Sequence, residues 1–290
     1  MTQPPSRRGF SVRVFLPGGD PDGIKVVEKS NWTGCGLVVP RALFTEAKAR
    51  PELERAGVYV LVGQSEVSPL PRVYVGEGDP VRPRLDQHAK QKDFWTHAVV
   101  FTSKDQNLNK AHVQRLEARL VELARTSKRC VLDNNNVPQA PSLSEADTAE
   151  VEGFLADILL CLPILGYGYF ESAPAVAPKA VPLVLRAKGI EAHGFESAKG
   201  FVVRAGSQAV KEDRLAPSMH AYLKETRAEL VRQGVLVDRG AAYEVAQDYT
   251  FSSPSTASGV LLGRSSNGRI EWQTADGRTL KSIQNAEVSG

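Results

Sequence analysis

The sequence has little of what marks disulfide-bonded, zinc-binding or membrane-spanning proteins. Only three cysteines occur among 290 residues, and none has the Cys-x-x-Cys spacing of a zinc site. Three scattered thiols favour a reducing compartment. The longest apolar stretch, about 154–165, is interrupted by Asp157 and Pro163 and is too short to span a bilayer. Residues 1–8 are polar and contain no apolar signal region, so the sequence predicts a cytoplasmic protein.

A strong charge of either sign is also missing. The net charge of +3 does not by itself indicate a nucleic-acid partner. Residues 57–130 nevertheless contain twelve Lys and Arg against eight Asp and Glu, a surplus of four, so basic charge is concentrated in this segment. An ordinary solvated surface explains such a surplus equally well. The apolar content of 42% and the length are typical of a globular protein with two domains.

Turn and linker signals divide the chain into parts with a mixed α/β (α+β) fold. We expect an N-terminal β-rich unit over 1–55 and a second domain with a helical extension over 56–172. Residues 173–183 are rich in proline and alanine, a composition typical of a semi-rigid linker. Residues 184–290 then form a C-terminal α+β accessory domain.

Hydrophobic periodicity predicts the elements of the second and C-terminal domains. Alternating or continuous apolar runs indicate strands, and apolar residues at helical spacing indicate helices. Asp79-Pro80 is a good helix start, because aspartate caps helices and proline is favoured at the first helical position. The predicted strands are 57–62, 72–76 and 95–102, and the predicted helices are 41–55, one from 79, 107–127, 143–162, 217–233 and 254–262.

Three polar side chains stand out in this pattern. Arg84 and His88 are four residues apart on a predicted helix and therefore share a face. Glu117 lies at the edge of the apolar stripe of the 107–127 helix, where a carboxylate is partly buried and needs a partner. Taken alone, Arg84 fits an ordinary surface ion pair as well as a binding role.

Two tripeptides give these residues a context. Gly57-Val58-Tyr59 and Tyr74-Val75-Gly76 lie on the first two predicted strands, ahead of Arg84, His88 and Glu117. Together the five features resemble the GIY-YIG nuclease superfamily, with valine in place of isoleucine in both tripeptides. The resemblance covers about residues 57–125. It implies a small domain with a three-stranded antiparallel sheet flanked by helices, and a DNA endonuclease that hydrolyses phosphodiester bonds.

The resemblance also implies roles for the site residues. Arg84 would bind the scissile phosphate, and Glu117 would hold a single divalent metal ion, Mg²⁺ or Mn²⁺. Tyr59 and Tyr74 would place their hydroxyls in the active-site groove, with Tyr59 as the general base. His88 is the alternative base or a relay to the leaving group, since histidine changes charge near neutral pH. The sequence does not separate Tyr59 from His88.

DNA contacts are expected around this site. Gly76 and Gly78 would let a phosphate backbone approach closely, although a simple strand-to-helix turn explains them equally well. Lys90 and Lys92 are candidates for non-specific phosphate contacts.

The last forty or so residues resemble a domain of unknown function that often accompanies GIY-YIG nucleases. Phe251-Ser-Ser-Pro254, Gly263-Arg264-Ser265 and Gly277-Arg278-Thr279-Leu280 carry this resemblance. We therefore expect an accessory domain that targets the nuclease, contributes nothing to bond cleavage, and offers a surface for a protein partner. The alternative function for the whole chain is a catalytically inactive, nuclease-derived DNA-binding or protein-interaction module.

Overall fold

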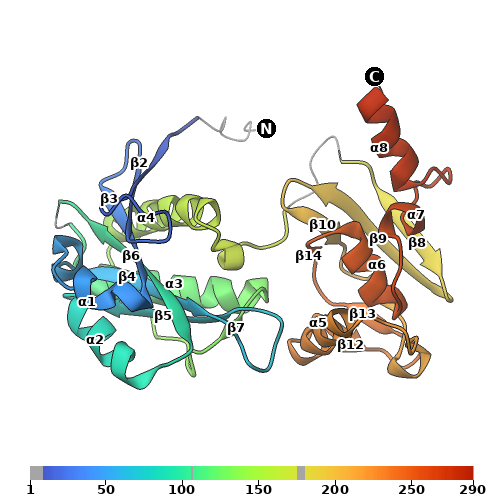
Figure 1. Ribbon diagram of the computed structural model, residues 1–290, viewed down its shortest axis with the longest axis horizontal. Coiled ribbons are helices and arrows are strands. Elements are labelled where there is room, and N and C mark those ends of the chain that lie inside the picture. The colour runs from blue at the N-terminus through green and yellow to red at the C-terminus, as the bar shows by residue number, and fades with distance from the viewer. Residues whose placement is uncertain (1–8, 106, 175–179, 290) are drawn as a thin grey trace. The chain divides into compact units, whose positions relative to one another are not determined.

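The computed structural model of the protein describes residues 9–105, 107–174 and 180–289 (Figure 1). The chain divides into two compact units: an N-terminal unit of residues 9–66 and 70–171, and a C-terminal unit of residues 67–69 and those from Ser172 onward. Both combine sheets with helices, as expected for a mixed α+β protein. No helix in the described ranges is long and apolar enough to cross a membrane. Part of the predicted linker, residues 175–179, lies outside the described residues.

The N-terminal unit is built on one seven-stranded sheet with the strand order β1-β2-β3-β6-β4-β5-β7. All neighbouring strands are antiparallel except the short β5–β7 pair, which is parallel. The strands are β1 Val12–Phe15, β2 Lys25–Lys29, β3 Gly34–Pro40, β4 Gly57–Gly63, β5 Arg72–Gly78, β6 Trp95–Ser103 and β7 Val131–Leu132. The helices are α1 Phe44–Ala47, α2 Arg82–Gln91, α3 Lys110–Ser127 and α4 Glu145–Ile164.

The expected three-stranded sheet of β4, β5 and β6 is therefore the centre of a larger sheet. Residues 1–55 were expected to form a unit of their own, but β3 pairs with β6 along its whole length, and β1 and β2 continue the same sheet. The predicted helix over 41–55 is a short α1 between two 3-10 turns at Arg41–Leu43 and Pro51–Glu54. Proline at position 51 ends the helical run, because it lacks an N–H group for the helix ladder.

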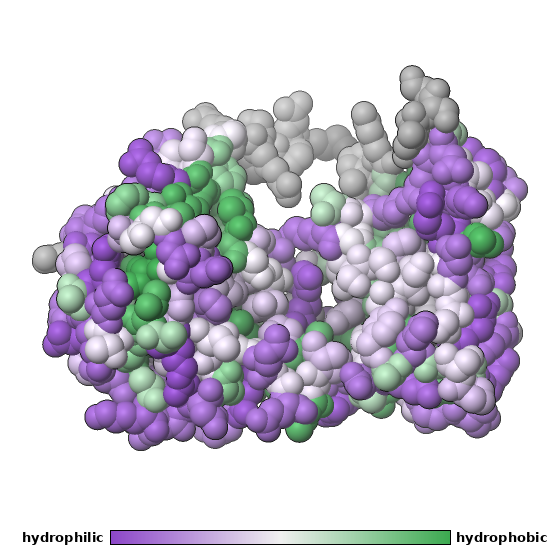
Figure 2. All heavy atoms as spheres, in the orientation of Figure 1, coloured by the Kyte–Doolittle hydropathy of each residue, from purple (hydrophilic) through white to green (hydrophobic). Residues whose placement is uncertain are grey.

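Two apolar layers cover this sheet. On one face, Tyr59, Leu61 and Val100 pack with Leu85 of α2 and with Phe44 of α1. On the other face, the valines of β4 and β5 pack against α3 and α4. Alternate residues of a strand point to opposite faces, so neighbours in the chain belong to different layers. The face of the N-terminal unit seen in Figure 2 also carries apolar side chains at its surface.

The C-terminal unit has a four-stranded sheet in the order β14-β10-β9-β8 and a three-stranded sheet in the order β11-β13-β12. Fully buried residues such as Trp272 and Phe201 form its single core with apolar residues of α5 and α6. The strands are β8 Leu183–Ala187, β9 Ile190–Ser197, β10 Gly200–Val203, β11 Gln208–Ala209, β12 Leu236–Asp238, β13 Tyr243–Val245 and β14 Tyr249–Phe251. The helices are α5 Ala221–Arg232, α6 Pro254–Leu262, α7 Gly268–Glu271 and α8 Leu280–Ser289.

Candidate active site

The β4–β5 hairpin brings both tyrosines of the tripeptide motifs to one face of the sheet. Tyr59 of β4 lies opposite Gly76 of β5, and Tyr74 lies opposite Leu61. The ring of Tyr59 covers Gly76 so closely that a Cβ atom there would lie 2.4 Å from the tyrosine hydroxyl. Glycine at position 76 is therefore required by the buried ring of Tyr59, and the predicted phosphate contact at this residue stays a prediction.

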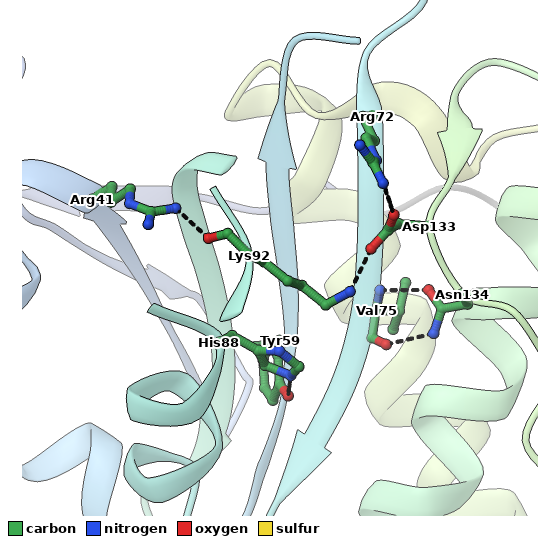
Figure 3. A network of polar contacts seen from close by, with 8 residues as sticks. All are labelled: Arg41, Tyr59, Arg72, Val75, His88, Lys92, Asp133 and Asn134. Carbon is green, nitrogen blue, oxygen red and sulfur yellow. Dashed lines mark hydrogen bonds and ion pairs between the residues drawn. The ribbon is translucent and has the colours of Figure 1, made fainter. Parts of the chain in front are cut away.

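Helix α2 adds His88 to the two tyrosines. The Nε2 atom of His88 and the Tyr59 hydroxyl form a hydrogen bond of 2.8 Å, which either ring tautomer can make (Figure 3). The His88 ring also packs against Tyr74, with 4.8 Å between ring centroids. Tyr59 has no exposed surface and His88 is only 5% exposed, whereas Tyr74 is half-buried. The site thus has a buried Tyr59–His88 pair beneath the more accessible Tyr74.

Burial keeps this pair neutral near pH 7. It lowers the pKa of His88 to about 4, and the positive charges of Arg84 and Lys92 add to that effect. Burial also raises the pKa of Tyr59, and the neighbouring Tyr74 raises it further. The Nδ1 atom of His88 is buried and has no hydrogen-bond partner in the described part of the chain. A neutral imidazole in contact with a phenol can exchange a proton with it, because both groups accept and donate.

Arg84 lies one turn before His88 on α2, and its side chain is exposed. Burial raises the pKa of both Tyr59 and Tyr74, and the charge and hydrogen bonding of Arg84 offset part of this rise, so the guanidinium lies close to both hydroxyls. It also donates to the side chain of Gln87 at 2.9 Å. Among the described residues no carboxylate forms an ion pair with Arg84, which leaves its charge open to an anion.

Glu117 approaches the same place from α3, which packs on the opposite face of the sheet. Its side chain is half-buried, and in the described ranges it has no hydrogen-bond or ion-pair partner. Burial raises the pKa of Glu117 to about 7, and repulsion by the carboxylate of Glu77 adds to the rise. Glu77 itself binds Lys110, with 2.7 Å from the lysine nitrogen to each carboxylate oxygen. Two neighbouring carboxylates, of which only Glu77 is paired with an ammonium group in the described part of the chain, form a site that favours a further cation.

The donor set around Glu117 fits a hard divalent cation that keeps most of its water. The described residues contain no group of three or more His, Cys, Asp or Glu side chains arranged to hold a metal ion. Mg²⁺ is commonly bound by one or two carboxylates, with water and substrate oxygens completing its shell. An unpaired, half-buried carboxylate beside a second acid is compatible with this mode of binding and not with an all-protein cage.

A loop after β7 holds the edge of β5, a role that the sequence did not indicate. The side chain of Asn134 accepts from the N–H of Val75 at 2.9 Å and donates to its carbonyl at 2.8 Å (Figure 3). It thereby replaces a neighbouring strand at that point. Asp133 accepts hydrogen bonds from Arg72 and Lys92. The only sequence signal was the Asp133-Asn-Asn-Asn136 cluster, which indicated a turn.

The four predicted DNA-binding residues differ in how free they are to contact a phosphate: Gly76, Gly78, Lys90 and Lys92. Lys92 is bound to Asp133 and lies 4.4 Å over the ring of Tyr74, so its charge is already compensated. Lys90 is exposed and has no ion-pair partner within the described ranges. A Cβ atom at Gly78 would lie 2.7 Å from the carbonyl oxygen of Pro80, so the tight turn into α2 requires glycine there. Of the four, Lys90 best fits a phosphate contact.

The other end of α2 is fixed by an arginine. Arg41 donates to the carbonyl oxygen of Lys92, which directly follows α2 (Figure 3), and to that of Ala89 in the last turn of the helix. Its guanidinium lies 4.7 Å over the ring of the buried Trp95. A cation bound to the free carbonyls of a helix C-terminus stabilises that end. This contact holds α2, and therefore His88, against the sheet.

Comparison with known families gives one match, in the C-terminal unit. Residues 183–284 match the family model of a domain of unknown function, DUF4357. The expected C-terminal domain of unknown function is thereby confirmed, and it begins well before the forty residues that carried its motifs. No model of the GIY-YIG family matches the chain. No curated protein and no solved structure matches it significantly.

Proposed function

We propose that the N-terminal unit is a metal-dependent endonuclease that hydrolyses phosphodiester bonds of DNA, as the resemblance to GIY-YIG nucleases implies. One observation carries the proposal. Tyr59, Tyr74, Arg84 and His88 gather around the end of β5, close enough to Glu117 for its charge to act on both tyrosines. A free arginine, a half-buried unpaired carboxylate and a neutral tyrosine–histidine pair are groups that phosphodiester hydrolysis uses.

Arg84 would bind the scissile phosphate. Its guanidinium has no acidic partner in the described ranges, and a planar guanidinium binds phosphate oxygens with two parallel hydrogen bonds. As negative charge grows on the phosphate oxygens in the transition state, a fixed arginine stabilises it more than it stabilises the ground state. Lys90, on the same helix, would add a contact to a neighbouring phosphate.

Tyr59 and His88 would act together in proton transfer. Tyr59 is completely buried, so its hydroxyl would have to become accessible to water when the substrate binds. Tyr59 would then take the proton of the attacking water as it passes its own proton to the neutral Nε2 of His88. This arrangement makes the two candidates for the general base parts of one relay.

Glu117 would hold a Mg²⁺ or Mn²⁺ ion, with Glu77 near enough to influence its charge. When bound, such an ion lowers the pKa of a coordinated water and stabilises charge on phosphate oxygens. The C-terminal unit would direct this activity to its DNA substrate, and no group there is assigned to bond cleavage.

The test is incubation of the full chain with supercoiled plasmid and with branched DNA, in Mg²⁺, in Mn²⁺ and in EDTA. We expect metal-dependent nicking that Glu117→Gln abolishes while DNA binding persists. Glu122→Gln is the matched control, because Glu122 is an exposed carboxylate on the same helix that pairs with Arg119. Binding of DNA without cleavage in any metal would instead favour the inactive DNA-binding module. Nicking by Glu117→Gln at the unmodified rate would remove Glu117 from the site.

A further inference from the structure

A lysine occupies an unusual backbone position in the C-terminal unit. Strands β8 and β9 are joined by the two-residue turn Lys188-Gly189, in which both residues have positive φ angles, 52° and 72°. Asn-Gly or Asp-Gly is preferred in such turns, because asparagine, aspartate and glycine adopt the left-handed region at low cost. A lysine there is strained by roughly 1 kcal/mol. The geometry of the turn therefore does not explain why lysine occurs at position 188.

The side chain of Lys188 connects the turn to the ends of two helices, the 3-10 helix Glu212–Arg214 and α6. Its Nζ donates to the carbonyl oxygens of Arg214, at 3.2 Å, and of Leu262, at 3.0 Å. In return, the guanidinium of Arg214 donates to the carbonyl of Lys188 at 2.6 Å. Arg264 follows Leu262 by two residues, beyond the end of α6. Three cationic side chains, from the β8–β9 turn, from the 3-10 helix Glu212–Arg214 and from the segment after α6, are therefore close enough to act on one another.

The charge of this cluster is poorly compensated. Arg264 binds Glu271, whereas Lys188 and Arg214 bind only carbonyl oxygens within the described part of the chain. Burial lowers the pKa of Lys188, and the positive charges of Arg264 and Arg214 lower it further. The three cations thus repel one another, and an anion between them would relieve the repulsion. All three side chains are at least partly exposed, so an anion can reach them from solvent.

We infer that Lys188, Arg214 and Arg264 form a phosphate-binding site through which the C-terminal unit holds the backbone of a DNA duplex. The three side chains are at least partly exposed, on a turn, a 3-10 helix and the segment after α6, and an open site of this kind suits a phosphate on a long polymer. Residues 183–284 contain 14 Lys and Arg against 11 Asp and Glu, a surplus of three. The choice of DNA as the polyanion rests on the proposed nuclease function, but the binding itself needs no catalysis.

The test measures binding of the full chain to a short labelled duplex by fluorescence anisotropy, in EDTA and over a range of salt concentrations. The variant Lys188→Asn/Arg214→Gln removes two charges, and asparagine keeps the left-handed turn. We expect affinity to fall about tenfold and the slope of log affinity against log salt to shrink by about one to two. The control Arg239→Gln/Arg278→Gln removes two exposed arginines that pair with Glu244 and Asp276.

Several outcomes distinguish binding at this site from a non-specific effect of positive charge on DNA affinity. The control should change affinity by less than about twofold, and the charge-conserving Lys188→Arg/Arg214→Lys should bind as the unmodified chain does. Thermal unfolding of each variant shows that it is folded. An equal loss in the control, or no loss in Lys188→Asn/Arg214→Gln, would overturn the proposal. So would a cluster-dependent affinity for anionic phospholipid vesicles with none for DNA. Because EDTA prevents cleavage, the result stands whether or not the nuclease proposal holds.

Discussion

Replacing Glu117 with glutamine should make the N-terminal unit more stable at alkaline pH. The pKa of this carboxyl is raised from 4.5 to about 7 in the folded protein, so the folded state binds its proton more tightly than the unfolded state does. Ionising this half-buried carboxyl therefore costs folding free energy. The cost is absent below pH 4.5, grows between pH 4.5 and 7, and is complete above pH 7. The rise corresponds to at most about 3 kcal/mol, and partial exposure to solvent reduces the expected gain to about 1–2 kcal/mol.

Hydrogen exchange of peptides from 57–132 can measure this effect, because it follows the opening of one unit in a chain with two. At pH 4 the Glu117→Gln variant should match the unmodified chain, and at pH 8 it should be more protected. Mg²⁺ should protect the unmodified chain at pH 8 and leave the variant unchanged, since the ion compensates the same charge. A variant that is less stable at pH 8, or a Mg²⁺ effect that survives the substitution, would refute this account of Glu117.

Three further predictions concern the site and the domain boundary. Arg84→Ala should lower the nicking rate by about a hundredfold or more, and Arg82→Ala, on the same helix, by less than about threefold; similar losses would indicate a surface role for Arg84. Gly76→Ala should destabilise the chain by about 1–3 kcal/mol in urea unfolding, because its Cβ would meet the Tyr59 ring. Gly153→Ala, in open space on α4, should stabilise it by up to about 1 kcal/mol, and a cost as large as that of Gly76→Ala would contradict the packing argument. Limited proteolysis should cut first within 173–182, and an earlier cut inside 57–130 would count against a linker there.

Local patterns predicted many elements of the fold. The helix expected at 254–262 is α6, since Ser253 caps it, Pro254 begins it and Gly263 ends it. Strand β6 and helix α3 differ from their predicted bounds by only a few residues. In each case the periodicity of apolar residues and the capping residues agree, so the local and the tertiary preferences coincide.

The sequence-based predictions failed where contacts between distant parts of the chain determine the structure. Helix α2 begins at Arg82, although Asp79-Pro80 resembled a helix start, because residues 79–81 are used for the turn out of β5. The join between β3 and β6 brings together segments about sixty residues apart, and no local pattern encodes such a pairing. The role of Asn134 also escaped prediction, since a side chain that replaces a strand partner has no periodicity of its own.

The sequence predicted which residues belong to the candidate site, but it did not predict how deeply each side chain is buried. Tyr59 and Tyr74 appear equivalent in the two tripeptides, yet one is fully buried and the other half-buried. The difference arises because Tyr59 is on a central strand beneath α2, while Tyr74 is on β5, near the edge of the sheet. Strand order, which the sequence does not contain locally, therefore decides which hydroxyl meets solvent first.

The same strand order explains why groups from both faces of the sheet can meet. Strand β7 pairs with β5 only at Arg72 and Val73, and Asn134 extends the pairing to Val75. By the alternation of backbone groups, the N–H and carbonyl of Glu77 then face an open edge. Helix α2 packs on one face and α3 on the other, yet the charge of Arg84 acts on Glu117, so we infer that the two side chains approach each other past that edge. A full-length neighbour beside β5 would separate Arg84 from Glu117, which makes the shortness of β7 a condition for the site.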